Sequence, residues 1–287
     1  MKLYKLIILI GILTTISLNA KSLRIEVSDL QKNLNTYKII DTRNEQLYLD
    51  KHIKGALNLP IKLTYNDQQT NGKVIQPTKA QELIRSLGLD VNDKIAIYDD
   101  GTFFDAARLF WTFEVYGFKN VKLLNGGLEQ WLKDGFQTTK IISKIKRSDY
   151  IVSVDHKRLA TKFTTQIATK NPNQVILDAR PSSGYDGETS SAQRFGHIKK
   201  ALHFPASHNI NYDEKITKLQ SINDLKKIYS KIGKKKKIIV YCAIGRISST
   251  NYFALRELDY DVANYDSSWR EWGNDANLPI INPSEEL

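Results

Sequence analysis

Residues 236–249 read KKIIVYCAIGRISS, and this segment is the most informative part of the chain about its fold. Residues 238–241 are four consecutive apolar or aromatic side chains, a pattern typical of a fully buried strand. That strand ends at Cys242, the only cysteine of the chain. A short loop with one glycine and one arginine follows, and residues 249–258 then favour a helix. The stretch therefore predicts a strand–loop–helix unit that carries a thiol at the carboxyl end of its strand.

The position of Cys242 predicts a chemical role. Backbone N–H groups of such a loop, together with the positive end of a helix dipole, favour the thiolate over the thiol. Ser248 or Ser249 is well suited to be the N-cap of the helix. A lone cysteine inside a domain is more often a buried, inert side chain. Here its place between strand and helix favours a nucleophile.

The chain contains an internal repeat, because four landmarks recur in the same order. The second copy also has an insertion between Arg180 and His197. The matching segments are 39–43 with 176–180, 52–60 with 197–205, 94–99 with 237–242, and Trp131 with Trp272.

Each copy alternates short buried strands with helical segments, which predicts an α/β fold with a parallel sheet flanked by helices. We expect a signal peptide over 1–20, a first domain over 22–139, a linker over 140–152 and a second domain over 153–287. In parallel sheets ligands bind at the carboxyl ends of strands, where Cys242 is expected to lie.

Two segments of the second copy resemble two-domain sulfurtransferases of the rhodanese type. They are YCAIGRISS at 241–249 and YDSSWREWG at 265–273. The resemblance implies two tandem rhodanese-like domains, and it implies that Cys242 accepts a sulfane sulfur, carries it as a persulfide and passes it to a thiophilic acceptor. The implied partners are a small anionic sulfur donor and a thiol or cyanide acceptor, with no cofactor.

The first copy lacks the nucleophile. Asp99 stands where the second copy has Cys242, in the acidic and bulky loop DDGTFFD at 99–105. We therefore expect this copy to be catalytically silent and to line the cleft. Asp178, His52 and His197 belong to landmarks that both copies share, so a structural use is expected for them.

A sulfur donor with an oxyanion needs cationic or hydrogen-bonding groups near the thiolate. Arg246 lies inside the loop and is the first candidate. Relatives often carry basic residues right after the cysteine or an arginine five positions on, where this chain has Ala243, Ile244 and Ile247. Arg180 is a further candidate, although an ion pair with a neighbouring loop is its expected role. Arg194 is the alternative anion-binding residue, because some relatives place an arginine where this chain has Gly184.

Three other residues complete the expected substrate site. Gly245 and Ser248 belong to the loop and its helix. Trp269 has no aromatic counterpart in the first copy, where Leu128 stands, and is expected to line the pocket. No metal is expected, because one cysteine and five scattered histidines show no ligand spacing.

Thiosulfate is the expected donor, and two alternatives stay open. One is a 3-mercaptopyruvate sulfurtransferase, and the other is a non-enzymatic persulfide carrier or interaction protein. A cysteine phosphatase is disfavoured because it needs an arginine six residues after the cysteine, where Ser248 stands.

The amino terminus and the charge bear on location and partners. A basic start, an apolar run from Leu6 to Leu18 and a small residue at Ala20 predict a cleaved signal peptide, and a retained anchor is the alternative that stays open. We therefore expect export to the periplasm or medium, with no stable membrane insertion after cleavage. The net charge of +11 is dispersed, and the one dense run, at 234–237, is expected to be a solvated turn. No nucleic acid partner is expected, and the oligomeric state is left open.

Overall fold

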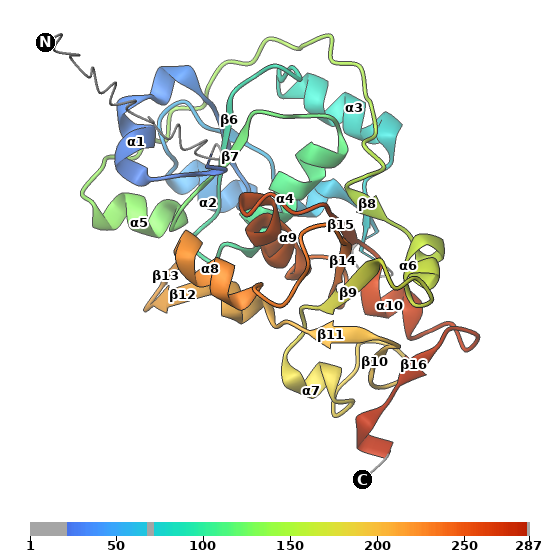
Figure 1. Ribbon diagram of the computed structural model, residues 1–287. Coiled ribbons are helices and arrows are strands. Elements are labelled where there is room, and N and C mark those ends of the chain that lie inside the picture. The colour runs from blue at the N-terminus through green and yellow to red at the C-terminus, as the bar shows by residue number, and fades with distance from the viewer. Residues whose placement is uncertain (1–21, 68–71, 286–287) are drawn as a thin grey trace, which may run out of the picture.

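The computed structural model describes residues 22–67 and 72–285, which form two α/β units (Figure 1). The expected signal peptide, residues 1–20, lies outside the described residues. Residues 134–158 connect the two units without a helix, and their one strand-like contact is the bridge between His52 and Thr139. The expected linker, 140–152, lies inside this stretch, and the domain limits stay a prediction.

The two units have the same sheet. The order in the first is β1-β7-β6-β2-β3 and in the second β8-β15-β14-β9-β11, and all pairs in both sheets are parallel. The strands of the first sheet are β1 (Arg24–Ile25), β2 (Lys38–Asp41), β3 (Leu57–Asn58), β6 (Ile95–Tyr98) and β7 (Val121–Leu124). Those of the second are β8 (Leu159–Ala160), β9 (Gln174–Asp178), β11 (Ala201–His203), β14 (Lys237–Tyr241) and β15 (Val262–Tyr265).

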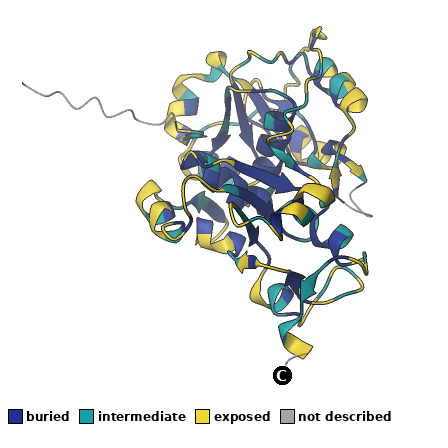
Figure 2. Cartoon of the chain, turned by 45° about the vertical axis from the view of Figure 1, so that its right-hand side comes forward, coloured by how far each residue is buried: buried dark blue, intermediate teal, exposed yellow. Residues whose placement is uncertain are grey.

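Helices cover both faces of each sheet, as predicted. The first unit has α1 (Val27–Lys32), α2 (Glu45–Asp50), α3 (Pro77–Ser86), α4 (Phe104–Val115) and α5 (Gly127–Lys133). The second has α6 (Lys162–Ala168), α7 (Ser182–Tyr185), α8 (Ile222–Ile228), α9 (Ser248–Glu257) and α10 (Ser268–Trp272). Figure 2 shows the sheets buried in the interior and the exposed residues on the outer sides of the helices. None of the helices in the described ranges has the length and apolar character that a membrane span requires.

Three antiparallel pairs of short strands lie outside the two parallel sheets in the described residues. Antiparallel pairs join β4 (Tyr65–Asp67) to β5 (Lys73–Val74), β12 (Ile210–Asp213) to β13 (Ile216–Leu219), and β10 (His197–Ile198) to β16 (Ile280–Ile281). Helix α7 corresponds to α2 of the first unit, and the insertion of the second copy lies in the loop between α7 and His197.

The two units share one hydrophobic core. Helices α4 and α9 pack against each other between the sheets, near the centre of Figure 1. The ring of Phe253 on α9 lies edge-on to Phe103 and Phe110, with centroid distances of 5.6 and 4.7 Å. Side chains of α3, α4, α8 and α9 all belong to this cluster. Both faces of the first sheet are covered, so both are apolar. On β2, Ile40 points to one face and joins the shared core, whereas Ile39 points to the other face and joins a separate core.

Candidate active site

Cys242 follows β14, the central strand of the second sheet, and only 1% of its surface is exposed. It packs with Ala179 and Ala206, and Phe104 of the first unit contacts this small cluster. The prediction that the thiol lies at the carboxyl end of a buried parallel strand is confirmed. Because Phe104 comes from α4, the thiol lies where the two units meet.

Hydrogen bonds hold the backbone of Cys242 against the start of α10. Its N–H donates to Ser268 Oγ at 3.0 Å, and its carbonyl accepts from the N–H of Trp269 at 2.9 Å. The Ser268 hydroxyl in turn donates to the Tyr265 carbonyl at 2.6 Å. Ser268 has a positive φ of 53°, a conformation that side chains other than glycine rarely adopt. The Ser268 hydroxyl accepts one hydrogen bond and donates another, and these two bonds hold the residue in this conformation.

Gly245 makes the turn of the loop. Its φ of +72° is left-handed, and its carbonyl accepts three side-chain hydrogen bonds. The donors are Asn264 Nδ2 at 3.0 Å, Ser249 Oγ at 2.8 Å and Arg108 Nη1 at 3.0 Å. Arg108 belongs to α4, so the first unit fixes the loop of the second.

The expected N-cap is wrong. Helix α9 begins at Ser248, and its N-cap is Ile247, whose φ of −70° and ψ of −28° are already helical. The chain leaves the Gly245 turn in helical conformation, which places both serines inside the first turn. Their hydroxyls bind other groups, and that of Ser248 donates to Asn264 Oδ1 at 2.8 Å. Ser248, an expected substrate contact, is thus buried and occupied.

Arg246 pairs with a carboxylate of the first unit. Its Nε donates to Asp105 Oδ1 at 2.5 Å, and its guanidinium lies 5.7 Å from the centre of the Phe104 ring. Burial lowers the pKa of Arg246, but the hydrogen bond and charge of Asp105 outweigh it and raise the pKa overall. The Arg246 side chain is 35% exposed, so it is accessible to an anion while already neutralised in part.

Arg180 and Trp269 stack on each other behind the loop. The guanidinium lies 4.6 Å from the Trp269 ring, and its Nη2 donates to Asp178 Oδ2 at 2.6 Å and to the Gly196 carbonyl at 2.8 Å. Trp269 is fully buried, and its indole N–H donates to Ser190 Oγ at 2.9 Å. This geometry gives Arg180 the expected ion pair and places Trp269 in the core instead of on an open pocket wall.

Arg194 is used by the end of the chain. Its guanidinium donates to the carbonyls of Gly273 at 3.2 Å, Leu278 at 2.9 Å and Trp272 at 2.9 Å, and also to that of Asp275. These bonds tie the insertion of the second copy to the segment after α10. The guanidinium of Arg194 is therefore bound to this segment and is not placed at the Cys242 loop to bind an anion.

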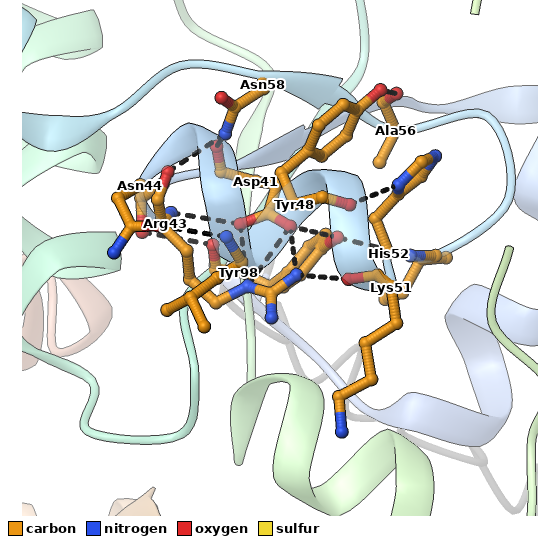
Figure 3. A network of polar contacts seen from close by, with 12 residues as sticks. Asp41, Arg43, Asn44, Tyr48, Lys51, His52, Ala56, Asn58 and Tyr98 are labelled. Carbon is orange, nitrogen blue, oxygen red and sulfur yellow. Dashed lines mark hydrogen bonds and ion pairs between the residues drawn. The ribbon is translucent and has the colours of Figure 1, made fainter. Parts of the chain in front are cut away.

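Both copies contain the same buried polar network at the end of β2 and β9. In the first, Arg43 Nη2 donates to Asp41 Oδ2 at 2.6 Å and the Tyr98 hydroxyl donates to the same oxygen at 2.6 Å (Figure 3). In the second, Arg180 and Tyr241 bind Asp178 in the same way. Because the first copy has the network although it has no cysteine, the network forms without a thiol beside it.

The two repeated histidines also serve the fold. His52 Nδ1 lies 2.7 Å from the Tyr48 carbonyl, and His197 Nδ1 lies 2.8 Å from that of Tyr185. Each imidazole stacks on the tyrosine ring, with centroids 3.9 and 3.8 Å apart. In the ranges that the structure describes, no three acidic, histidine or cysteine side chains converge as metal ligands.

Asp99 occupies the position of the nucleophile in the first copy. Its carboxylate accepts the N–H of Gly101 at 3.0 Å and that of Ala106 at 3.3 Å. Burial, helped by the charges of Asp100 and Asp105, raises the pKa of Asp99 from 3.8 to about 7. In the first copy, backbone N–H groups of the loop thus donate hydrogen bonds to Asp99, the side chain that stands in the place of Cys242.

This pKa predicts how stability depends on pH. A carboxyl whose pKa is higher in the folded state contributes stability that is complete below about pH 4 and is lost as pH rises through about 7. Asp99→Asn, which cannot titrate, should therefore gain stability relative to the wild type between pH 4 and pH 8. Urea unfolding of both proteins across this range measures the difference, and parallel pH curves would contradict the assignment.

Sequence reasoning missed the residues that the first unit contributes. Arg108 is fully buried and binds the carbonyls of Gly245 and Gly72, the latter at 2.9 Å. The backbone of Gly72 lies so close to the loop that an added Cβ would be 2.5 Å from Ile244 Cβ. The Val74 N–H donates to Asp266 Oδ2 at 2.7 Å. No local sequence pattern signalled these residues, because their contacts cross from one unit to the other.

Comparisons with known proteins agree with this architecture. The profile of the rhodanese-like domain matches residues 26–134 and 160–275. A Saccharopolyspora erythraea protein, provisionally named a thiosulfate sulfurtransferase, is 30% identical over 89% of this chain and 95% of its own length. The 3-mercaptopyruvate sulfurtransferase of Escherichia coli is 28% identical over 84% of this chain and 86% of its own.

A solved structure shows the same fold. The crystal structure of SseA from Escherichia coli superposes with a TM-score of 0.77 and 24% identity, and the match covers 87% of this chain and 99% of that one. Each matched range contains the strands of one sheet, apart from β1 and the first residue of β8 at the sheet edges. The chain therefore belongs to the rhodanese-like family and carries the family's domain twice.

Proposed function

We propose that this sulfurtransferase takes a sulfane sulfur from thiosulfate and carries it on Cys242 as a persulfide. The observation that carries the proposal is the position of the chain's only thiol, at the carboxyl end of β14 and on a loop fixed from both units. The equivalent loop of the first unit holds Asp99, which has no sulfur chemistry.

The reaction divides into two displacements. The Cys242 thiolate attacks the outer sulfur of thiosulfate, a sulfur–sulfur bond forms, and the bond to the sulfonate sulfur breaks with its electron pair, which releases sulfite. The acceptor, cyanide or a thiolate, then attacks the terminal sulfur of the persulfide and leaves the Cys242 thiolate behind. No proton, metal or redox partner is needed for either step.

The charge and position of Arg246 favour an anionic sulfur donor. It is a cation on the Cys242 loop and is in part accessible to solvent. Charge-assisted hydrogen bonds from a guanidinium to sulfonate oxygens are strong. The provisional name of the Saccharopolyspora erythraea relative supports thiosulfate, whereas the name of the Escherichia coli relative supports 3-mercaptopyruvate as a second candidate.

Steady-state kinetics with both donors tests the proposal. Purified protein is given thiosulfate or 3-mercaptopyruvate, with cyanide as acceptor, and thiocyanate formation is followed. We expect kcat/KM to be higher for thiosulfate. A higher value for 3-mercaptopyruvate would reverse the assignment of the donor, and persulfide that forms without turnover would indicate a carrier.

The pairing of Arg246 with Asp105 predicts opposite effects for two substitutions. Arg246→Ala removes a charge-assisted contact and should lower kcat/KM for thiosulfate by roughly 10- to 150-fold. Asp105→Asn should lower KM by roughly two- to fivefold, because the donor no longer competes with a carboxylate for the guanidinium. Alkylation of Cys242 by iodoacetamide should be retained in both variants, which checks that the loop is intact.

Arg194→Ala is the comparison variant. It removes bonds to the segment after α10 and should lower the melting temperature with little change in KM. If Arg194→Ala instead abolished activity while Arg246→Ala changed kcat/KM by less than about threefold, the anion site would lie on the loop 181–196.

A further inference from the structure

The first unit closes over the Cys242 loop with the hairpin of β4 and β5. The backbone of Gly72, just before β5, lies against Ile244 of the loop. Arg108 lies beneath the hairpin and links the carbonyls of Gly72 and Gly245. Tyr65, the first residue of β4, is therefore at the boundary between the silent unit and the catalytic loop.

Tyr65 is a buried tyrosine with an unused hydroxyl. Its ring lies under the Arg108 guanidinium at 4.5 Å, and only 6% of the residue is exposed. Its hydroxyl oxygen is buried and has no hydrogen-bond partner among the described residues. Other buried tyrosines of the first unit are bonded, since the hydroxyl of Tyr48 donates to the Ala56 carbonyl and that of Tyr150 to the Tyr116 carbonyl.

An unpaired buried hydroxyl costs stability, so it calls for an explanation. The charged groups that act on this hydroxyl belong to the active site: Arg108, Asp105, Arg246 and Cys242. Burial, the largest influence, raises the pKa of Tyr65 above its usual value. At neutral pH the group is therefore a neutral O–H that can donate a hydrogen bond.

We propose that Tyr65 is a substrate-contacting catalytic residue supplied by the first unit, and that its hydroxyl donates a hydrogen bond to a sulfonate oxygen of the bound sulfur donor. This rests on the proposed function. When the bond to the outer sulfur of thiosulfate breaks, negative charge grows on the departing sulfite, and a preorganised donor stabilises it.

Two cations also lie at this boundary. Arg108 uses two of its nitrogens on carbonyls and has no partner for its Nε among the described residues, and the Nε of Arg246 is paired with Asp105. In an in-line displacement the leaving sulfite is on the opposite side of the transferred sulfur from Cys242, where a neutral donor of the first unit adds to the charge of Arg246.

Tyr65→Phe tests this in single-turnover experiments. The rate at which thiosulfate loads Cys242 should fall by roughly 10- to 150-fold. The rate at which cyanide discharges a fully loaded persulfide should stay within about twofold, because sulfite has already left. The melting temperature should be unchanged or higher, since the substitution keeps the ring and removes an unpaired hydroxyl.

Tyr48→Phe is the matched control. It removes a bonded buried hydroxyl of the same unit, far along the chain from the hairpin, and should lower the melting temperature while both half-reactions keep their rates. Normal loading of Tyr65→Phe, or an equal loss in loading and discharge, would overturn the role of Tyr65. A wild-type protein that thiosulfate never loads would instead overturn the proposed donor, and the two failures are thus distinguishable.

Discussion

Cys242→Ser should abolish sulfur transfer, with a loss of at least about 10³-fold in kcat/KM. A serine hydroxyl is not ionised at neutral pH and cannot form a persulfide. Mass spectrometry after incubation with thiosulfate should show one added sulfur atom on the wild type and none on the variant. Since the chain has no other cysteine, no second thiol can take over the sulfur.

The control addresses folding, because the thiol is buried. Cys242→Ala avoids an unpaired hydroxyl, and both variants should keep the cooperative urea unfolding of the wild type. A Cys242→Ser protein that still gains sulfur and forms thiocyanate at a comparable rate would disprove the central assignment.

Gly245→Ala should unfold the loop and cost more than about 3 kcal/mol of stability. At φ +72° an alanine is strained, and its Cβ would lie 2.6 Å from Arg108 Nη1 and 2.7 Å from the carbonyl oxygen of Asp266. The side chain of Arg108 cannot move freely because its other nitrogen binds Gly72. Urea denaturation measures the loss, and sulfur transfer should fall with it.

Gly135→Ala separates the strain of the backbone conformation from the steric clash of the added Cβ. Gly135 has a similar φ of +79°, but an added Cβ there meets nothing within 4 Å. This variant should lose only about 1 kcal/mol, the cost of the backbone conformation. Equal losses in the two variants would mean that the contact of the loop with Arg108 and Asp266 contributes nothing.

The sequence was sufficient to predict the fold because the repeat supplied two independent copies of each landmark. Strands β6 and β14 are short runs of buried apolar residues, and both occupy the centre of their sheets. Helix ends were less predictable. The start of α9 depends on the Gly245 turn, whose left-handed conformation is set by contacts with Arg108 and Asn264, and no local pattern around Ser248 encodes those contacts.

The site was predictable only where it is local in sequence. Cys242 and its loop follow from one strand–loop–helix pattern. The partners of the loop, Asp105 and Arg108, come from the other unit, and their roles depend on how α4 packs against α9. The first unit contributes Phe104 to the Cys242 cluster, and the expectation that this unit lines a cleft stays a prediction.

The contact of Arg108 with the Gly245 carbonyl has an evolutionary consequence. After a gene duplication, the copy without a nucleophile is usually considered free to drift. Here drift at Arg108 or Gly72 would reach the chemistry of the other copy directly, through bonds and close contacts that cross between them. Selection for sulfur transfer therefore also acts on the first unit, and loss of that unit would remove a hydrogen bond that holds the Cys242 loop.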